Sequence, residues 1–351
     1  MSVAEKTMPP SSKGVSRAPL FIGVILIAGG LLLLGWLGWA ILHSAGDGEA
    51  PYQYKKVAEG GVEKFPDLGL EAYEGMTIRK YELLAEEVQK DPLVEFYTGS
   101  KGDHAPVLLE WKNNLIEPVL TVSGDIKDLT KLARAIAEHV PSEAVVLGWW
   151  DTSRQLELLE GVNTLFDENL AQPLLIPGPW AKQQKAIENL EHEFWQVTDS
   201  SEAKVRQKRI AEALLADEAT GASILRELAG GREAYVVVHW ADAYKLGGMA
   251  PERFGIGYND FPGSKQTHAL IPRVKQWMEE NGYETYLVQR QGEDTVRAYF
   301  LTDSAYKDTL IAKMLPFSTS QPTELEKLKL VAQYGGYWVY SLPPAPANDA
   351  G

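Results

Sequence analysis

The residues best suited to chemistry lie in one stretch, 141–170, where a short apolar segment is followed directly by two tryptophans and an acid. The segment Ala144–Leu147 is typical of a strand buried on both faces, and Trp149, Trp150 and Asp151 come just after it. Ligands of α/β proteins bind at the carboxyl ends of such strands. Two indoles beside a carboxylate suit a small polar or cationic ligand, so a binding cleft is predicted here.

A second apolar segment, Tyr235–Val238, is followed by His239 and Asp242, which are therefore expected at the same sheet edge. A His/Asp pair there could act in proton transfer or bind a metal. We assign no catalytic residue and no metal site. The complete set of ligand-binding candidates is Trp149, Trp150, Asp151, Ser153, Arg154, Asn163, Asp167, Asn169, His239 and Asp242.

The same residues also have a purely structural interpretation. Asp151, Thr152 or Ser153 is suited to cap the following helix, and the tryptophans are suited to a core. His239 fits the start of a helix equally well. The sequence contains no glycine-rich phosphate loop, zincin signature or nucleophile elbow that would decide between binding and structure.

Alternating strand and helix patterns predict a mixed-sheet α/β body over residues 61–342. A helical insertion is expected at 181–230, a linker at 43–60 and a disordered tail at 343–351. Strands are expected at 94–97, 106–111, 117–122, 144–147, 235–238, 285–289, 296–301 and 337–341. The strands at 285–289 and 296–301 are expected to form a hairpin. Other helices are expected at 128–139, after residue 151, from Pro272 and at 305–314.

An uncharged, mostly apolar segment of 23 residues, Leu20–Leu42, precedes this body. At about 1.5 Å per residue it spans roughly 34 Å, enough for a single transmembrane helix. The cytoplasmic stub 1–19 carries three basic residues and one acid, so the body should face the periplasm across a bacterial inner membrane. A cleaved signal peptide is the alternative, although such apolar regions are shorter.

Composition excludes several classes of function. The chain has no cysteine, which excludes disulfides, thiolate zinc sites, cysteine nucleophiles and covalent c-type haem, so no cofactor is expected. Beyond residue 43 it holds 31 basic and 47 acidic residues, a net charge of −16. That charge disfavours nucleic acid. It suits a positively charged redox partner, or serves only to keep the protein soluble.

Part of the stretch 141–170 resembles the soluble domain of oligosaccharyltransferase catalytic subunits. Three motifs of this chain follow the order of the family's motifs: Pro141 to Ala144, Trp149-Trp150-Asp151 and Thr164 to Asn169. In that family the Trp-Trp-Asp residues recognise the acceptor amino acid. Thr152-Ser153 departs from the family's Tyr-Gly, and a single span departs from its many-span catalytic domain. The resemblance implies at most a shared fold and a binding corner, not glycosyl transfer.

A longer resemblance is to the hydroxylamine oxidation protein HaoB family. It rests on the single span, the acidic α/β body, the string Leu147 to Arg154, and Tyr299 to Asp303 before a Lys-Asp-Thr-Leu helix. This resemblance implies a membrane-anchored accessory protein of nitrification, with a multihaem c-type cytochrome or oxidoreductase as partner. The alternative from the residues is a small polar-ligand binder or enzyme that uses the Trp-Trp-Asp cleft.

Overall fold

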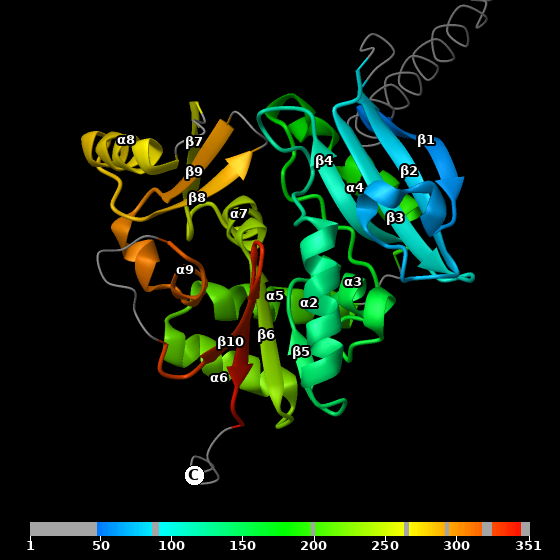
Figure 1. Cartoon of the computed structure of the whole chain (residues 1–351). Helices are drawn as coiled ribbons and strands as arrows, with labels where there is room; N and C mark the ends of the chain where they lie inside the picture. The colour runs from blue at the N-terminus through cyan, green and yellow to red at the C-terminus, as the bar shows by residue number, and fades with distance from the viewer. Residues whose placement is uncertain are drawn as a thin grey trace, which may run out of the picture. The chain divides into compact units, whose positions relative to one another are not determined.

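The computed structural model describes residues 48–85, 91–197, 201–262, 267–291, 295–317 and 325–344 (Figure 1). Residues from Ala50 onward form one compact unit. The predicted stub 1–19, the predicted span 20–42 and residues 345–351 of the predicted tail lie outside the described ranges. Among the helices that are described, none is both long and apolar enough to cross a bilayer.

The first sheet is antiparallel, with its strands in chain order: β1 (Tyr52–Gly60), β2 (Met76–Ala85), β3 (Val94–Lys101) and β4 (Val107–Asn113). Two short 3-10 turns, η1 (Val62–Lys64) and η2 (Pro66–Leu68), lie between β1 and β2. Helix α4 (Gln184–Phe194), which follows η3 (Gly178–Gln183), packs its apolar stripe on the aromatic face of this sheet. That face carries Tyr54, Phe96 and Trp111.

Two predictions in this region are wrong. The linker predicted at 43–60 ends earlier, because residues 52–60 form β1 and pair with β2 along their length. The side chains of Tyr52 and Tyr54 point to the same face of this strand, and Tyr52 is buried. The charged residues that follow them in the sequence hid the strand pattern. The strand predicted at 117–122 is absent: Leu120 has φ of +64°, which interrupts the extended backbone, and makes only an isolated bridge to Leu175.

The second sheet is mixed and lies at the centre of the unit. Its order is β10 (Lys329–Tyr334), β11 (Tyr337–Leu342), β6 (Ala234–His239) and β5 (Val145–Leu147). Strands β5 and β6 are parallel, whereas the other two pairs are antiparallel. The carboxyl ends of β5 and β6 therefore meet at one edge of the sheet.

Helices cover both faces of this central sheet. Successive side chains of a strand point to opposite sides, and β5 and β6 carry apolar side chains on both. Val146 and Val237 pack with α2 (Ile126–His139) and α3 (Trp150–Glu160). Val145 and Val236 pack with α5 (Ser201–Leu215), α6 (Glu218–Ala229) and α9 (Leu310–Met314). The predicted insertion 181–230 is helical, but its helices pack on two different sheets: α4 on the first sheet, and α5 and α6 on the central sheet.

A third, antiparallel sheet has the order β7 (Ile256–Pro262), β9 (Thr295–Leu301) and β8 (Tyr286–Gln291), which confirms the predicted pairing of β8 with β9. Helix α8 (Thr267–Glu280) packs on it, and Pro272 lies inside this helix rather than opening it. Helix α7 (Trp240–Met249) joins β6 to β7, and the turn η4 (Ser304–Asp308) precedes α9. The mixed α/β architecture is as predicted, but the strands of the described ranges form three sheets rather than one.

Candidate functional site

The Trp-Trp-Asp corner lies where β5 passes into α3. Trp149 is the N-cap residue of α3 with extended backbone, and its side chain makes no capping hydrogen bond. Its indole is buried in the core between the central sheet and α5 and α6. Trp150 is only partly buried and packs against the same core. One of the two tryptophans thus fills the core, as the structural interpretation expected.

Asp151 is buried and bonded on both carboxylate oxygens. Its Oδ1 accepts a hydrogen bond from the backbone N–H of Thr152 at 2.7 Å, and its Oδ2 accepts one from Lys245 Nζ at 2.6 Å. The side chains of Asp151 and Lys245 are only 5% and 3% exposed. Lys245 Nζ also lies 5.6 Å from the centre of the Trp149 ring, a cation–π distance. This ammonium group therefore neutralises the carboxylate inside the core.

His239 and Asp242 form a reciprocal cap at the start of α7. The backbone N–H of Ala241 donates to His239 Nδ1 at 3.1 Å, and the backbone N–H of His239 donates to Asp242 Oδ2 at 2.8 Å. Asp242 Oδ1 lies 3.5 Å from Lys245 Nζ. The ends of β5 and β6 thus bring Asp151, His239 and Asp242 to one cluster, which Lys245 completes. A ligand at this cluster stays a prediction.

Burial sets the protonation of the cluster. It raises the pKa of Asp242 to about 6; Lys245 works against that rise and the charge of Asp151 adds to it. Burial, and next the positive charge of Lys245, hold the pKa of His239 well below 6.5. His239 is therefore neutral at pH 7, as the hydrogen bond accepted by its Nδ1 requires.

The other candidates hold the backbone rather than line a cleft. Asn163 Nδ2 donates to the carbonyl of Ala144 at 2.9 Å. Asn169 Nδ2 donates to the carbonyls of Pro106 and Trp195 at 2.8 and 2.9 Å. Both amides therefore fix the loop that follows α3.

Three further candidates have different surroundings. Arg154 bonds to Glu157 within α3. The side chain of Asp167 is 86% exposed and lies 3.9 Å from Arg206. Ser153 is buried, and its hydroxyl has no hydrogen-bond partner in the described chain. Neither Arg154 nor Asp167 has an interaction with His239 or Asp242 among the contacts described.

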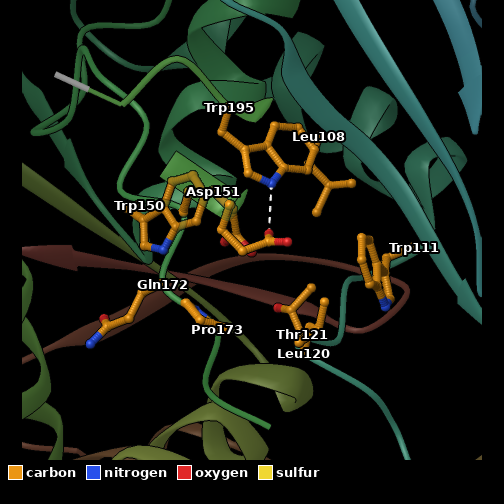
Figure 2. A pocket seen from close by; sticks show the side chains of 11 residues that line it. Leu108, Trp111, Leu120, Thr121, Trp150, Asp151, Gln172, Pro173 and Trp195 are labelled. Carbon is orange, nitrogen blue, oxygen red and sulfur yellow. Dashed lines mark hydrogen bonds between the residues drawn. The ribbon is translucent and has the colours of Figure 1, made fainter. Parts of the chain in front are cut away.

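A cavity of about 20 Å³ adjoins Asp151, with Trp111, Trp150 and Trp195 around it (Figure 2). A single water molecule needs about this much space. The cavity is also lined by a second buried carboxylate, Glu191 of α4. The corner has room for very little beyond a water molecule.

Three donors bind Glu191. The hydroxyls of Tyr52 and Tyr54 both donate to its Oε1 at 2.5 Å, and Trp195 Nε1 donates to its Oε2 at 3.0 Å, the dashed line in Figure 2. Burial raises the pKa of Glu191, and these three hydrogen bonds oppose the rise. The cluster ties β1 to α4.

Backbone strain is concentrated around this small cavity. In the described chain three non-glycine residues have positive φ: Leu120 at +64°, Ala171 at +43° and Gln196 at +53°. Leu120 and Ala171 line the cavity, and Gln196 follows Trp195, which also lines it. Such conformations cost about 1–3 kcal/mol each and persist only where the surroundings impose them.

His239 also lines a larger cavity, of about 190 Å³, where β4, the start of α2 and β8 approach the central sheet. Its walls carry acidic and basic side chains, Glu110, Asp125, Asp128, Lys112 and Arg290. In the described residues no group of three or more His, Asp or Glu side chains could hold a metal ion. The cavity is polar and of mixed charge.

Sequence reasoning missed Lys245 and Glu191. A lysine between Ala243 and Leu246 on the buried face of a helix was the available signal for the first. Glu191 gave a weaker signal, a carboxylate beside the apolar stripe of a charged helix. The arrangement is a buried ion cluster of Asp151, Asp242 and Lys245. Ser153 Oγ and Asp242 Oδ1 have no hydrogen-bond partner in the described chain.

Comparison with known proteins gives one family and a weak structural similarity. The family model described as HaoA-associated protein HaoB matches residues 15–342. No curated protein matches the chain. A similar solved structure is the crystal structure of the C. jejuni PglB C-terminal domain, at 12% identity, covering 61% of this chain and 99% of that chain, with a TM-score of 0.29. At that TM-score the similarity does not establish a shared fold.

Proposed function

The chain belongs to the family of the HaoA-associated protein HaoB, and from this premise we propose that it is an accessory protein of hydroxylamine oxidation. In this proposal it docks the multihaem oxidoreductase HaoA and carries out no reaction itself. The association with HaoA that gives the family its description supports this partner. The proposal needs no cofactor in this chain, which has no cysteine to attach a c-type haem.

The observation that carries the proposal is the closure of the Trp-Trp-Asp corner. Asp151, Asp242 and Lys245 are 2–4% exposed. Lys245 Nζ donates to Asp151 Oδ2 and lies 3.5 Å from Asp242 Oδ1, which has no hydrogen-bond partner in the described chain. A ligand-binding corner would leave a charge uncompensated until the ligand arrived, whereas here Lys245 already serves Asp151. The sealed cluster supports a structural role for these residues, and so an activity exerted through the protein surface.

The alternative, a small-ligand binder that uses the Trp-Trp-Asp cleft, would require space at Asp151. The cavity there is about 20 Å³, against several hundred for ordinary ligand pockets. A ligand larger than about one water would have to displace the indoles or the strained segments at Leu120 and Ala171. This cost weighs against the alternative.

The proposal includes the location of the protein. Leu20–Leu42 would anchor it in the bacterial inner membrane, with residues 1–19 in the cytoplasm and the acidic body in the periplasm. Tethering would hold the body beside a periplasmic oxidoreductase. A tether raises the effective concentration of a partner without any additional contact.

The experiment is affinity isolation of the tagged full chain from detergent-solubilised native membranes, followed by haem staining and mass spectrometry. We expect a multihaem cytochrome to be recovered at low salt and lost at high salt, because an acidic surface binds through screened charges. Membranes without the tag provide the background. A clean preparation without any cytochrome at every salt concentration would refute the proposal.

A further inference from the structure

One end of the first sheet holds both the start of β1 and the loop that follows β4, the two outer strands of that sheet (Figure 1). The pairing registers place Tyr54, Leu83, Val94 and Asn113 in one row across the sheet. Strand β1 begins two residues before this row, and β4 ends at it. Neighbouring strands lie about 4.8 Å apart, so three steps place the end of β4 roughly 15 Å from Tyr54.

The loop 114–118 presents two adjacent apolar side chains to solvent. Leu115 is 45% exposed and Ile116 is 71% exposed, the highest value among the large hydrophobic side chains of the described ranges. The base of the loop is fixed: Asn113 Oδ1 accepts from the backbone N–H of Val119 at 2.8 Å, and Asn114 donates twice to backbone carbonyls just before β3. Apolar side chains held out in water in this way are typical of an interaction site.

An aromatic pair lies at the same end of the sheet. Tyr52, the first residue of β1, stacks on Trp180 of η3 with ring centres 5.3 Å apart, and Trp180 is only partly buried. Tryptophan and tyrosine are the residues enriched where a protein meets the membrane–water interface. Asp91 and Glu117 are also exposed at this end. Their charges disfavour anionic headgroups, so a lipid contact here would depend on the apolar side chains.

The proposed anchor would keep this end of the sheet close to the bilayer. Nine residues, 43–51, separate the segment Leu20–Leu42 from β1. Even a fully extended chain spans only roughly 35 Å over that distance. Because β1 begins at the end of the sheet that carries the loop 114–118, the loop lies within reach of the lipid surface.

We infer that the loop 114–118 is a second membrane contact, in which Leu115 and Ile116 enter the interfacial region of the bilayer beside the anchor. The inference rests on the membrane anchoring included in the proposed function, but not on the partner HaoA. Two points of attachment fix the orientation of the body on the membrane, which one tether does not. Since the contact is apolar, salt should not release it, whereas salt screens docking between charged surfaces.

The test places a nitroxide label on the full chain in phosphatidylcholine liposomes. The chain has no cysteine, so Ile116→Cys provides its sole thiol, at a position exposed enough for the fold to persist. The matched control is Val331→Cys, at an apolar position that is 49% exposed on β10 of the central sheet. Electron paramagnetic resonance measures collisions of each label with a polar nickel complex. They should be about fivefold or more rarer at position 116, at low and high salt, because an apolar phase excludes polar solutes.

A second variant tests the role of the neighbouring side chain. Leu115→Ser, combined with the label at position 116, should increase the nickel collisions, because it removes half of the apolar contact. Equal collisions at positions 116 and 331 overturn the inference, although recovery of a cytochrome from native membranes would still support the proposed function. Shielding of position 116 only after purified HaoA is added also overturns it and assigns the loop to the partner. A chain that does not float with the liposomes overturns the inference together with the proposed anchor.

Discussion

Lys245 Nζ lies 2.6 Å from Asp151 Oδ2, although 94 positions separate the two residues in the sequence. The ion pair joins α7 to α3 across the carboxyl ends of β6 and β5. Both side chains are withdrawn from water, so each charge depends on the other. The corner where the sequence predicts a ligand is thus occupied by a side chain of the protein itself.

Lys245→Met should strongly destabilise the protein, because it leaves Asp151 and Asp242 buried without a counter-charge. Removing one partner of a buried pair costs about 3–5 kcal/mol of unfolding free energy. Urea unfolding at pH 7 measures this cost. The cost should shrink as pH falls, since burial raises the pKa of Asp242 and its protonation removes one uncompensated charge.

Lys275→Met is the matched control. Lys275 pairs with Glu279 at 3.7 Å, but both side chains are about two-thirds exposed. Exposed pairs contribute little, so a change within about 0.5 kcal/mol is expected. Equal effects of the two lysine variants would contradict the assignment of a sealed cluster.

His239→Asn should make the protein less sensitive to acid. The folded state holds the pKa of His239 well below 6.5, so in acid the unfolded chain takes up a proton that the folded chain does not. This contribution to stability is present above pH 6.5 and is lost as pH falls. Asparagine keeps a capping acceptor but does not titrate. Between pH 6.5 and 5 the variant should lose up to about 2 kcal/mol less than wild type.

Asp242→Asn should change the pH dependence in the opposite direction. Its pKa is raised to about 6 in the folded state, so its contribution is complete below pH 3.8 and is lost as pH rises through 6. Stability of the variant relative to wild type should therefore increase from pH 4 to 6. Chemical unfolding at several pH values measures both variants, and parallel curves for variant and wild type would show that the cluster does not titrate as described.

Glu191→Gln should destabilise the contact between β1 and α4. One carboxylate oxygen accepts from Tyr52 and Tyr54 and the other from Trp195, so an amide nitrogen at either place faces a donor. The cost should be about 1–3 kcal/mol in urea unfolding. Glu188→Gln, on the same helix and bonded only to Gln184 in the described contacts, should cost less than about 0.5 kcal/mol. If Glu191→Gln left the free energy of unfolding unchanged, this would argue against the three-donor cluster.

Gly336→Ala should disturb His239 directly. A Cβ at Gly336 would lie 2.3 Å from His239 Nε2, in the turn between β10 and β11. We expect a loss of about 1–3 kcal/mol in thermal unfolding, the usual cost of overpacking. Gly178→Ala meets nothing within 4 Å and should leave the melting temperature unchanged. Tolerance of alanine at both sites would mean that His239 is not held in place by this turn.

Three strands of the central sheet, β5, β6 and β11, could be predicted because their signals are local. The apolar segments at β5 and β6 and the periodicity of α2 come from a few neighbouring residues. Strand β1 was missed because its buried tyrosines are separated by charged residues, and β10 because its face is largely exposed. Sorting strands into three sheets depends on pairings far apart in the chain, which local patterns do not specify.

The candidate site was predictable only in part. Parallel strand ends justified placing Asp151 near His239 and Asp242, and the structure places them so. Lys245, whose ion pair with Asp151 closes this corner, lies one turn after Asp242 on α7, and its partner is identified only when α7 is packed beside α3. Likewise, Glu191 meets Tyr52 across 139 positions.

The most direct measurement is equilibrium binding between the purified full chain and purified HaoA at low and high salt, for wild type and Asp151→Asn. In the variant Lys245 keeps Asp242 as its counter-charge, so the fold is expected to persist. The account predicts a complex that weakens as salt rises and is equally strong in both proteins, because docking uses the surface. Absence of a complex at every salt concentration, or its loss in Asp151→Asn alone, would contradict the account.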